Sequence, residues 1–321
     1  GLPAFGSRTL FALSILLSLG LFATTFSTLD GTWISRVYIT AYLPIQSFLL
    51  MWLLAKTLVE GTAPLMTISA YVLTTLALLS AHQLKLPFFI ALGAGLVFFM
   101  QIRVGGKTTL KAFSVGFVAS LIFMIVAQEI RFPHMTVGQG ISQKIEYAFR
   151  LATSKIVYRQ VETAYCLHQA TQRHSADDMK FDKQLFWIAG LIPRAVWPQK
   201  PSLSLGQHYA VTYCGLPNRE NGHSSSITLL GQPIVMGGAN GVILHGGLLV
   251  LMMGGLTWAT RQWPGLGVIF IMSLMPWWID FDQDFALYIA NLVKFALFIV
   301  LSLVIFKLAE EAWRRLNAQK A

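Results

Sequence analysis

The sequence predicts an all-α polytopic membrane protein with about eight transmembrane helices and one large polar insert on the outer side of the membrane. The 321-residue chain has a mean hydropathy of +0.60 and only 12% charged residues, whereas about a quarter of the residues in a soluble domain are charged. Several apolar runs are long enough to cross about 30 Å of hydrocarbon at 1.5 Å per residue. A polar stretch, residues 131–241, interrupts them.

Eight apolar segments are the candidate spans, and they divide the chain into three parts. The segments are 9–26, 38–58, 63–81, 86–102, 113–130, 242–260, 265–279 and 285–306. We therefore predict five transmembrane helices in residues 1–130, a substrate-binding insert in 131–241, and three more transmembrane helices with a tail in 242–321.

The distribution of Lys and Arg near the span ends predicts the orientation. The loop 103–111 carries three cations and no acid, and the tail after residue 306 holds four Lys or Arg. Both are typical of cytoplasmic segments. The loop 280–284 holds three acids and no base, which favours the outside. With eight spans the insert also lies outside, which in a bacterial inner membrane is the periplasm. The net charge of +10 partly reflects this bias, and no nucleic-acid-binding pattern is present.

The first part of the insert predicts amphipathic helix. Residues 141–172 lack Gly and Pro, and apolar residues recur near helical spacing with cations between them. This pattern favours one or two helices at the membrane surface. The whole insert holds 11 Lys+Arg against six Asp+Glu. Because long outer loops escape the positive-inside rule, this surplus is a local property and indicates anion binding.

Only two cysteines occur, Cys166 and Cys214, and both lie in the insert. In an oxidising compartment they can form one disulfide, which would stabilise the fold by about 4 kcal/mol in the chain-entropy model. The alternative is two free buried thiols. No Cys/His spacing fits a metal site, so we expect no metal and no other cofactor.

The second part of the insert, residues 191–222, contains three prolines within nine residues, which exclude a regular helix there. Arg194 and Lys200 flank Trp197 in this run. Guanidinium binds phosphate oxygens in a bidentate manner, and Lys acts as a point charge. An indole ring can stack on a sugar face. These residues predict an anionic, sugar-bearing substrate; the alternative is an interfacial anchor with snorkelling cations.

Two arginines of the first part of the insert are further candidates for substrate binding. Arg150 and Arg159 lie on the predicted helix and can supply a second set of phosphate ligands. An ordinary i,i+3 salt bridge between Arg159 and Glu162 is the alternative.

Catalytic candidates are His223, Asp280 and Asp282. A neutral imidazole before the Ser224–Ser226 run can act as a general base toward a sugar hydroxyl, and the alternative is a helix N-cap. The acids of the 280–284 loop can also act as base, and the alternative is a solvated turn. Within or near the spans, Glu129 and Lys294 are charges that are costly in hydrocarbon and therefore functional candidates. They can pair with one another or with an acid of the outer loop.

The sequence also resembles a known family. IPRAVWPQKPS (residues 192–202) followed by HSSSITLLGQPIVMGG (223–238) is similar to the Wzy-type oligosaccharide repeat-unit polymerases of bacterial surface polysaccharides. The enterobacterial common antigen polymerases are closest in pattern, with an I-P-x-x-x-W-P-x-[KR]-P-S run and then H-S-x. The segment QIRVGGKTTLK and the helix around 150–169 also take part in the likeness.

The resemblance implies a membrane glycosyltransferase of the GT-C type that uses undecaprenyl-pyrophosphate-linked glycan at the periplasmic face without a metal. It also implies a chain-length regulator and a flippase as partners. The cations Arg150, Arg159, Arg194 and Lys200 would then stabilise the leaving pyrophosphate, and His223 or an acid of the 280–284 loop would activate the acceptor hydroxyl. Two alternatives remain: an O-antigen ligase-like lipid-sugar transferase, and a transporter or flippase for a lipid-linked or anionic solute. Transporters usually contain inverted repeats, and we find none in the sequence.

Overall fold

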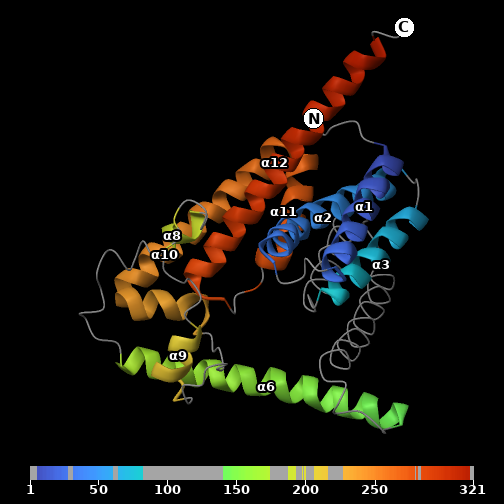
Figure 1. Cartoon of the computed structure of the whole chain (residues 1–321). Helices are drawn as coiled ribbons and strands as arrows, with labels where there is room; N and C mark the ends of the chain where they lie inside the picture. The colour runs from blue at the N-terminus through green and yellow to red at the C-terminus, as the bar shows by residue number, and fades with distance from the viewer. Residues whose placement is uncertain are drawn as a thin grey trace, which may run out of the picture. The chain divides into compact units, whose positions relative to one another are not determined.

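A computed structural model gives the fold (Figure 1). It describes residues 6–27, 32–60, 64–81, 140–173, 187–192, 197, 199, 206–215, 227–278, 280 and 283–318. The regular secondary structure of these residues is entirely helical. The helices are α1 Ser7–Thr25, α2 Trp33–Glu60, α3 Pro64–Ser80, α6 Ile141–Arg173, α8 Ile188–Leu191, α9 Gly206–Thr212, α10 Thr228–Gln262, α11 Pro264–Trp278 and α12 Phe285–Ala318.

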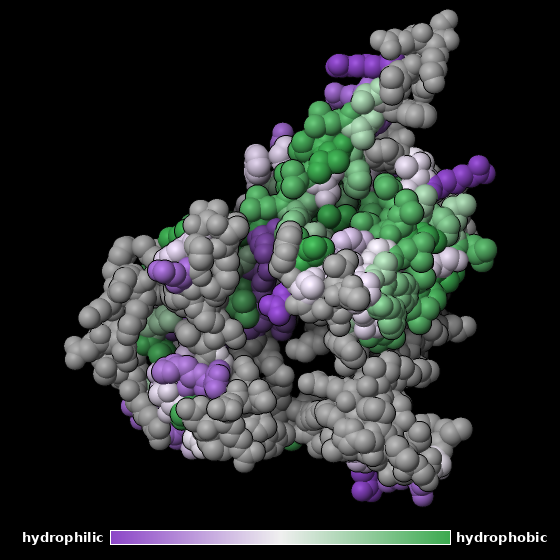
Figure 2. Space-filling view, in the orientation of Figure 1, coloured by the Kyte–Doolittle hydropathy of each residue, from purple (hydrophilic) through white to green (hydrophobic). Residues whose placement is uncertain are grey.

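Apolar helices of membrane-spanning length confirm the class of protein. Among the described residues, four segments are long and apolar enough to cross a bilayer: Ser7–Thr25, Ile34–Thr57, Thr228–Gln262 and Phe285–Ala312. Leu65–Ser80 and Gly265–Trp278 are shorter apolar helices. Figure 2 shows hydrophobic side chains over α1, α3 and the middle of α12, and hydrophilic ones on α6. The chain is therefore a helical membrane protein. The predicted spans 86–102 and 113–130 lie outside the described residues.

The chain forms two compact units. The first comprises Gly1–Gln139, Ala259–Pro276 and Phe295–Ala321; the second comprises Gly140–Trp258 and Trp277–Lys294. The second unit therefore contains α6, α8, α9, most of α10 and the start of α12. It contains most of the predicted insert and also the acidic loop before the last span, although residues 242–279 separate them in the sequence. The predicted three-part division by polarity remains a prediction.

In the first unit, polar side chains join three apolar helices. The amide Nε2 of Gln46 on α2 donates to Ser14 Oγ on α1 (2.5 Å) and to Thr74 Oγ1 on α3 (2.6 Å). Side-chain hydrogen bonds of this kind, together with small residues, hold helices together where lipid removes the hydrophobic driving force. These contacts explain why α1, α2 and α3 pack on one another.

The second unit has its own small core. Helix α6 is one continuous helix of 33 residues, so the prediction of helix is confirmed and the structure selects one helix over two. Its buried face packs on aromatic and aliphatic side chains from α9 and α10. The core consists of Cys166, Ala170, Tyr209, Tyr213, Ile227 and Val235. The packing of α9 against α6 thus positions the loop segments of the insert.

Helix α10 is bent at Gly238, where φ is 53° and ψ is −140°. Only glycine adopts this backbone region readily. The helix begins at Thr228, fourteen residues before the predicted span at 242. The sequence does not predict this first helical segment, because it contains Gly and Pro residues, which are typical of loops. The bend divides α10 into a short first segment and a longer second one.

We expect Gly238→Ala to lower the free energy of unfolding by about 1–3 kcal/mol, because alanine is strained at this φ and ψ. Gly246→Ala is the matched control on the same helix: a Cβ there meets no atom within 4 Å, so the change should be neutral or slightly stabilising. Tryptophan-fluorescence melting of the purified protein in detergent measures both. Equal melting temperatures for the two variants would show that the bend at Gly238 is not required.

Candidate functional site

Half of the predicted site residues lie outside the described residues. These are His223, Asp282, Arg194 and Lys200. Arg159 lies on α6, and only its backbone is described. Of the predicted site residues, the structure describes the side chains of Arg150, Trp197 and Asp280. They lie on different segments of the chain.

Arg150 lies on the exposed surface of α6. Its Nη2 atom pairs with Glu146 Oε1 at 3.0 Å, an i,i+4 ion pair in which the two side chains are 79% and 64% exposed. An exposed pair of this type contributes only about 0.3–0.5 kcal/mol, so it leaves the guanidinium accessible at little cost. Trp197 is also exposed, at 40%. The predicted contacts of both residues with a phosphorylated sugar remain predictions.

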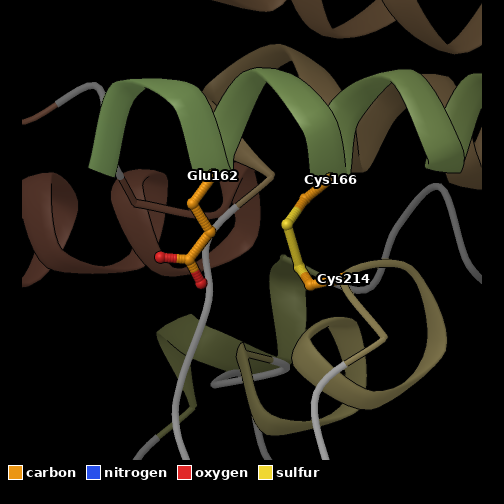
Figure 3. Close-up of side chains that lie close together, drawn as sticks. All are labelled: Glu162, Cys166 and Cys214. Atoms are coloured by element: carbon orange, nitrogen blue, oxygen red, sulfur yellow. A yellow bond between two sulfur atoms is a disulfide. The ribbon is translucent and has the colours of Figure 1, made fainter. Parts of the chain in front are cut away.

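The two cysteines form a disulfide. Cys166 on α6 is bonded to Cys214, which follows α9, with 4.7 Å between their Cα atoms. Of the two alternatives drawn from the sequence, the disulfide is therefore confirmed. Glu162 lies one turn earlier on α6 beside the bond (Figure 3), and its carboxylate and the two sulfurs lie within 4.8 Å of one another. Because both sulfurs are bonded to each other, this trio offers no thiolate to a metal.

Asp280 lies in the sequence between α11 and α12 and is half-buried. Gln283 Nε2 donates a hydrogen bond to Asp280 Oδ2 at 2.7 Å. Asn291 Nδ2 donates in turn to Gln283 Oε1 at 2.9 Å, and Lys294 Nζ donates to Asn291 Oδ1 at 3.0 Å. These four residues form a continuous run of side-chain hydrogen bonds, which we name the Lys294-to-Asp280 chain.

The Lys294-to-Asp280 chain bears on one prediction from the sequence, that Lys294 pairs with Glu129 or with an acid of the outer loop. That prediction stays a prediction. Glu129 lies outside the described residues, and the link from Lys294 to Asp280 runs through two amides. Gln283 and Asn291 were not among the site residues predicted from the sequence. The i,i+3 spacing of Asn291 and Lys294, which places them on one helix face, was the available signal.

A second polar cluster surrounds the start of α12. Gln232 on α10 is 2% exposed, and its Oε1 accepts a hydrogen bond from the Ala286 N–H at 2.7 Å. This satisfies one of the backbone donors that a helix leaves unpaired in its first turn. Asp284, 5% exposed, precedes the same helix, where the helix dipole favours a negative charge. Gln232 thus links α10 to the first turn of α12.

Tyr209 on α9 belongs to this second cluster. Burial, and then the nearby charge of Asp284, raise the pKa of the Tyr209 hydroxyl. A raised pKa keeps the phenol protonated, and therefore neutral, throughout the physiological range. Nearby, the buried His245 on α10 donates from Nδ1 to the Gly241 carbonyl at 2.7 Å, and its ring meets Phe285 edge-on at 4.3 Å. Asp284 and Phe285 therefore lie beside side chains of α9 and α10.

No protein-family model matches the chain, and neither a curated protein nor a solved structure matches it. The fold and the described residues define a class of protein, a helical membrane protein. Its second unit carries an internal disulfide and, before α12, the half-buried Asp280 and the buried Asp284.

Proposed function

We propose that the protein is a polymerase that joins undecaprenyl-pyrophosphate-linked oligosaccharide repeat units into surface polysaccharide at the periplasmic face of the bacterial inner membrane. The observation that carries this proposal is the Cys166–Cys214 disulfide. Structural disulfides persist in oxidising compartments such as the periplasm and are rare in the cytosol. The bond therefore supports an extracytoplasmic insert, in agreement with the charge bias of the loops.

The proposed topology agrees with the same observation. Eight spans place both termini in the cytoplasm and put residues 131–241, together with the 280–284 loop, outside. The surplus of cations in this insert, 11 Lys+Arg against six Asp+Glu, then faces the leaflet in which a translocated lipid diphosphate would lie. The membrane helices would hold the polyprenyl chain, and the insert would cover the headgroup.

In the proposed reaction, a hydroxyl of one repeat unit attacks the anomeric carbon of the growing chain. The hydroxyl proton passes to a base, for which Asp280, Asp282 and His223 are the candidates. A glycosidic C–O bond forms while the bond between the anomeric carbon and the pyrophosphate oxygen breaks. Undecaprenyl pyrophosphate leaves with the electron pair of that bond. Preorganised cations lower the barrier because negative charge develops on the leaving oxygen.

The roles of the predicted residues follow from this step. Arg194 and Lys200 would bind the diphosphate, with Arg150 and Arg159 on α6 as a second set of cations. Trp197 would stack on a sugar ring. The half-buried Asp280, held by Gln283, is the best-supported candidate for the base among the described residues, because a base must be held in hydrogen-bonding reach of the proton it removes.

An assay with the purified full-length chain tests the proposal. The chain is reconstituted in vesicles with undecaprenyl-pyrophosphate-linked oligosaccharide, and the products are separated by gel electrophoresis. We expect a ladder that grows by one repeat unit per band, with release of undecaprenyl pyrophosphate. A single transfer to a lipid A core acceptor would indicate a ligase instead. Movement of the lipid-linked sugar across the bilayer without any new glycosidic bond would indicate a flippase.

A further inference from the structure

We propose that Lys294, acting through Asn291 and Gln283, is a positioning residue that orients the Asp280 carboxylate for the transfer reaction. This inference rests on the function proposed above. The observation behind it is the Lys294-to-Asp280 chain, whose three hydrogen bonds measure 3.0, 2.9 and 2.7 Å from the lysine to the carboxylate. It assigns a role to an intramembrane cation and to two amides that the proposed reaction does not otherwise use.

The two ends of the chain fix the orientation of both amides. A lysine ammonium can only donate, and a carboxylate can only accept. Asn291 must therefore present its oxygen to Lys294 and its NH₂ group to Gln283. Gln283 must likewise present its oxygen to Asn291 and its NH₂ group to Asp280. With an ammonium at one end and a carboxylate at the other, every bond runs in one direction, and such aligned bonds strengthen one another.

The chain connects two depths of the protein. Lys294 lies nine residues after Phe285 on α12, about 13 Å along the helix at 1.5 Å per residue. Asp280 lies before the helix, in the 280–284 loop. A charge inside a membrane helix is expensive and is usually functional, and here its charge is linked to an acid at the proposed catalytic face. The intramembrane cation is thereby coupled to the rotation of the Asp280 carboxyl group.

This coupling matters because catalysis depends on position. The Gln283 hydrogen bond occupies Oδ2 of Asp280 and so restricts the rotation of the carboxylate. A misplacement of about 1 Å in a catalytic group can reduce a rate by about 100-fold. Breaking the chain should therefore affect kcat more than KM, because it disturbs the base and leaves the diphosphate ligands of the insert unchanged.

Asn291→Asp separates positioning from mere neutralisation of the lysine. The substituted carboxylate still accepts a hydrogen bond from Lys294, but it has no NH₂ group to donate to Gln283. We expect normal abundance in the membrane, a melting temperature no lower than that of the wild type, and a kcat about 10- to 100-fold lower with little change in KM. Asn240→Asp, at an exposed position on α10, is the matched control and should keep full activity.

A double-mutant cycle tests whether Asn291 acts through Asp280. In an Asp280→Asn background, Asn291→Asp should cause no further loss of kcat, because the group being positioned is already disabled. A wild-type kcat for Asn291→Asp alone would overturn the proposal, as would a loss that is fully additive with that of Asp280→Asn. Either result would mean that the Lys294-to-Asp280 chain only provides hydrogen-bond partners for Lys294 and does not position Asp280.

A readout without substrate distinguishes failure of this inference from failure of the proposed function. Reductive dimethylation with isotope-labelled methyl groups leaves one N–H on each lysine, and the Lys294 signal is assigned by its loss in Lys294→Arg. We expect Gln283→Leu to shift this NMR signal. An unchanged signal would show that the chain does not form and would overturn the inference. If Gln283→Leu shifts the signal but the wild-type protein makes no glycan, the chain is confirmed and the polymerase function is refuted.

Discussion

Arg194→Ala should abolish long-chain polysaccharide while the protein remains in the membrane at normal abundance. The guanidinium is expected to bind the diphosphate in a bidentate manner and to stabilise the negative charge that develops as the anomeric C–O bond breaks. Loss of one preorganised contact of this kind reduces kcat by about 100- to 1,000-fold. Gel analysis of surface polysaccharide in a deletion strain complemented with the variant measures the effect, with an immunoblot of membranes for abundance.

Two further variants make the Arg194 result specific. Arg261→Ala removes an exposed arginine in the last turn of α10, on the opposite side of the membrane in the proposed topology, and should leave the polymer unchanged. Arg194→Lys retains the charge but loses the bidentate geometry, so partial activity is expected. If long-chain glycan persists in Arg194→Ala, Arg194 is not part of the site.

Removal of the disulfide should have the largest effect on stability. The bond closes a loop of 48 residues, and in the chain-entropy model a loop of this length corresponds to about 4 kcal/mol. We therefore expect Cys166→Ser with Cys214→Ser to lower the unfolding free energy of the second unit by about that amount. Loss of polymer should follow, because α9 and the loops around it would no longer be tied to α6.

The disulfide experiment has an internal control. Limited proteolysis of the purified protein, with and without dithiothreitol, measures opening of the insert. Reductant should accelerate cleavage of the wild type and have no effect on the double serine variant. If the wild type and the double variant are cleaved at the same rate without reductant, the packing of Tyr209, Tyr213 and Ile227 against α6 is sufficient by itself.

The strong local patterns of the sequence were the reliable ones. The predicted span 9–26 is helical in α1 apart from its last residue, and the Gly- and Pro-free stretch 141–172 is the single helix α6. Long runs with one period need no distant partner to define them, since every backbone hydrogen bond in a helix is local. The weak local patterns were missed. Helix α9 and the first turns of α10 contain or adjoin Gly and Pro and are held by packing.

The candidate site divides in the same way. Residue type alone singled out Asp280 and Lys294, because three acids without a base in one short loop and a cation within a span both stand out. Gln232, Gln283 and Asn291 carry no such signal, since an amide is unremarkable until its partners are known. The sequence left open whether the two cysteines are bonded or free. The packing of α9 on α6 decides for the disulfide, because it brings two Cα atoms that are 48 residues apart in sequence to 4.7 Å from each other.

The sequence by itself determined that this is a helical membrane protein with a basic, cysteine-containing insert, because hydropathy and charge act residue by residue and need no fold to be read. Only the tertiary structure decided that Cys166 meets Cys214 and that Lys294 reaches Asp280 through two amides. The physical reason is that a hydrogen bond or a disulfide depends on distances of a few ångströms. Such distances are set by how helices pack, and side-chain order along a chain does not contain them.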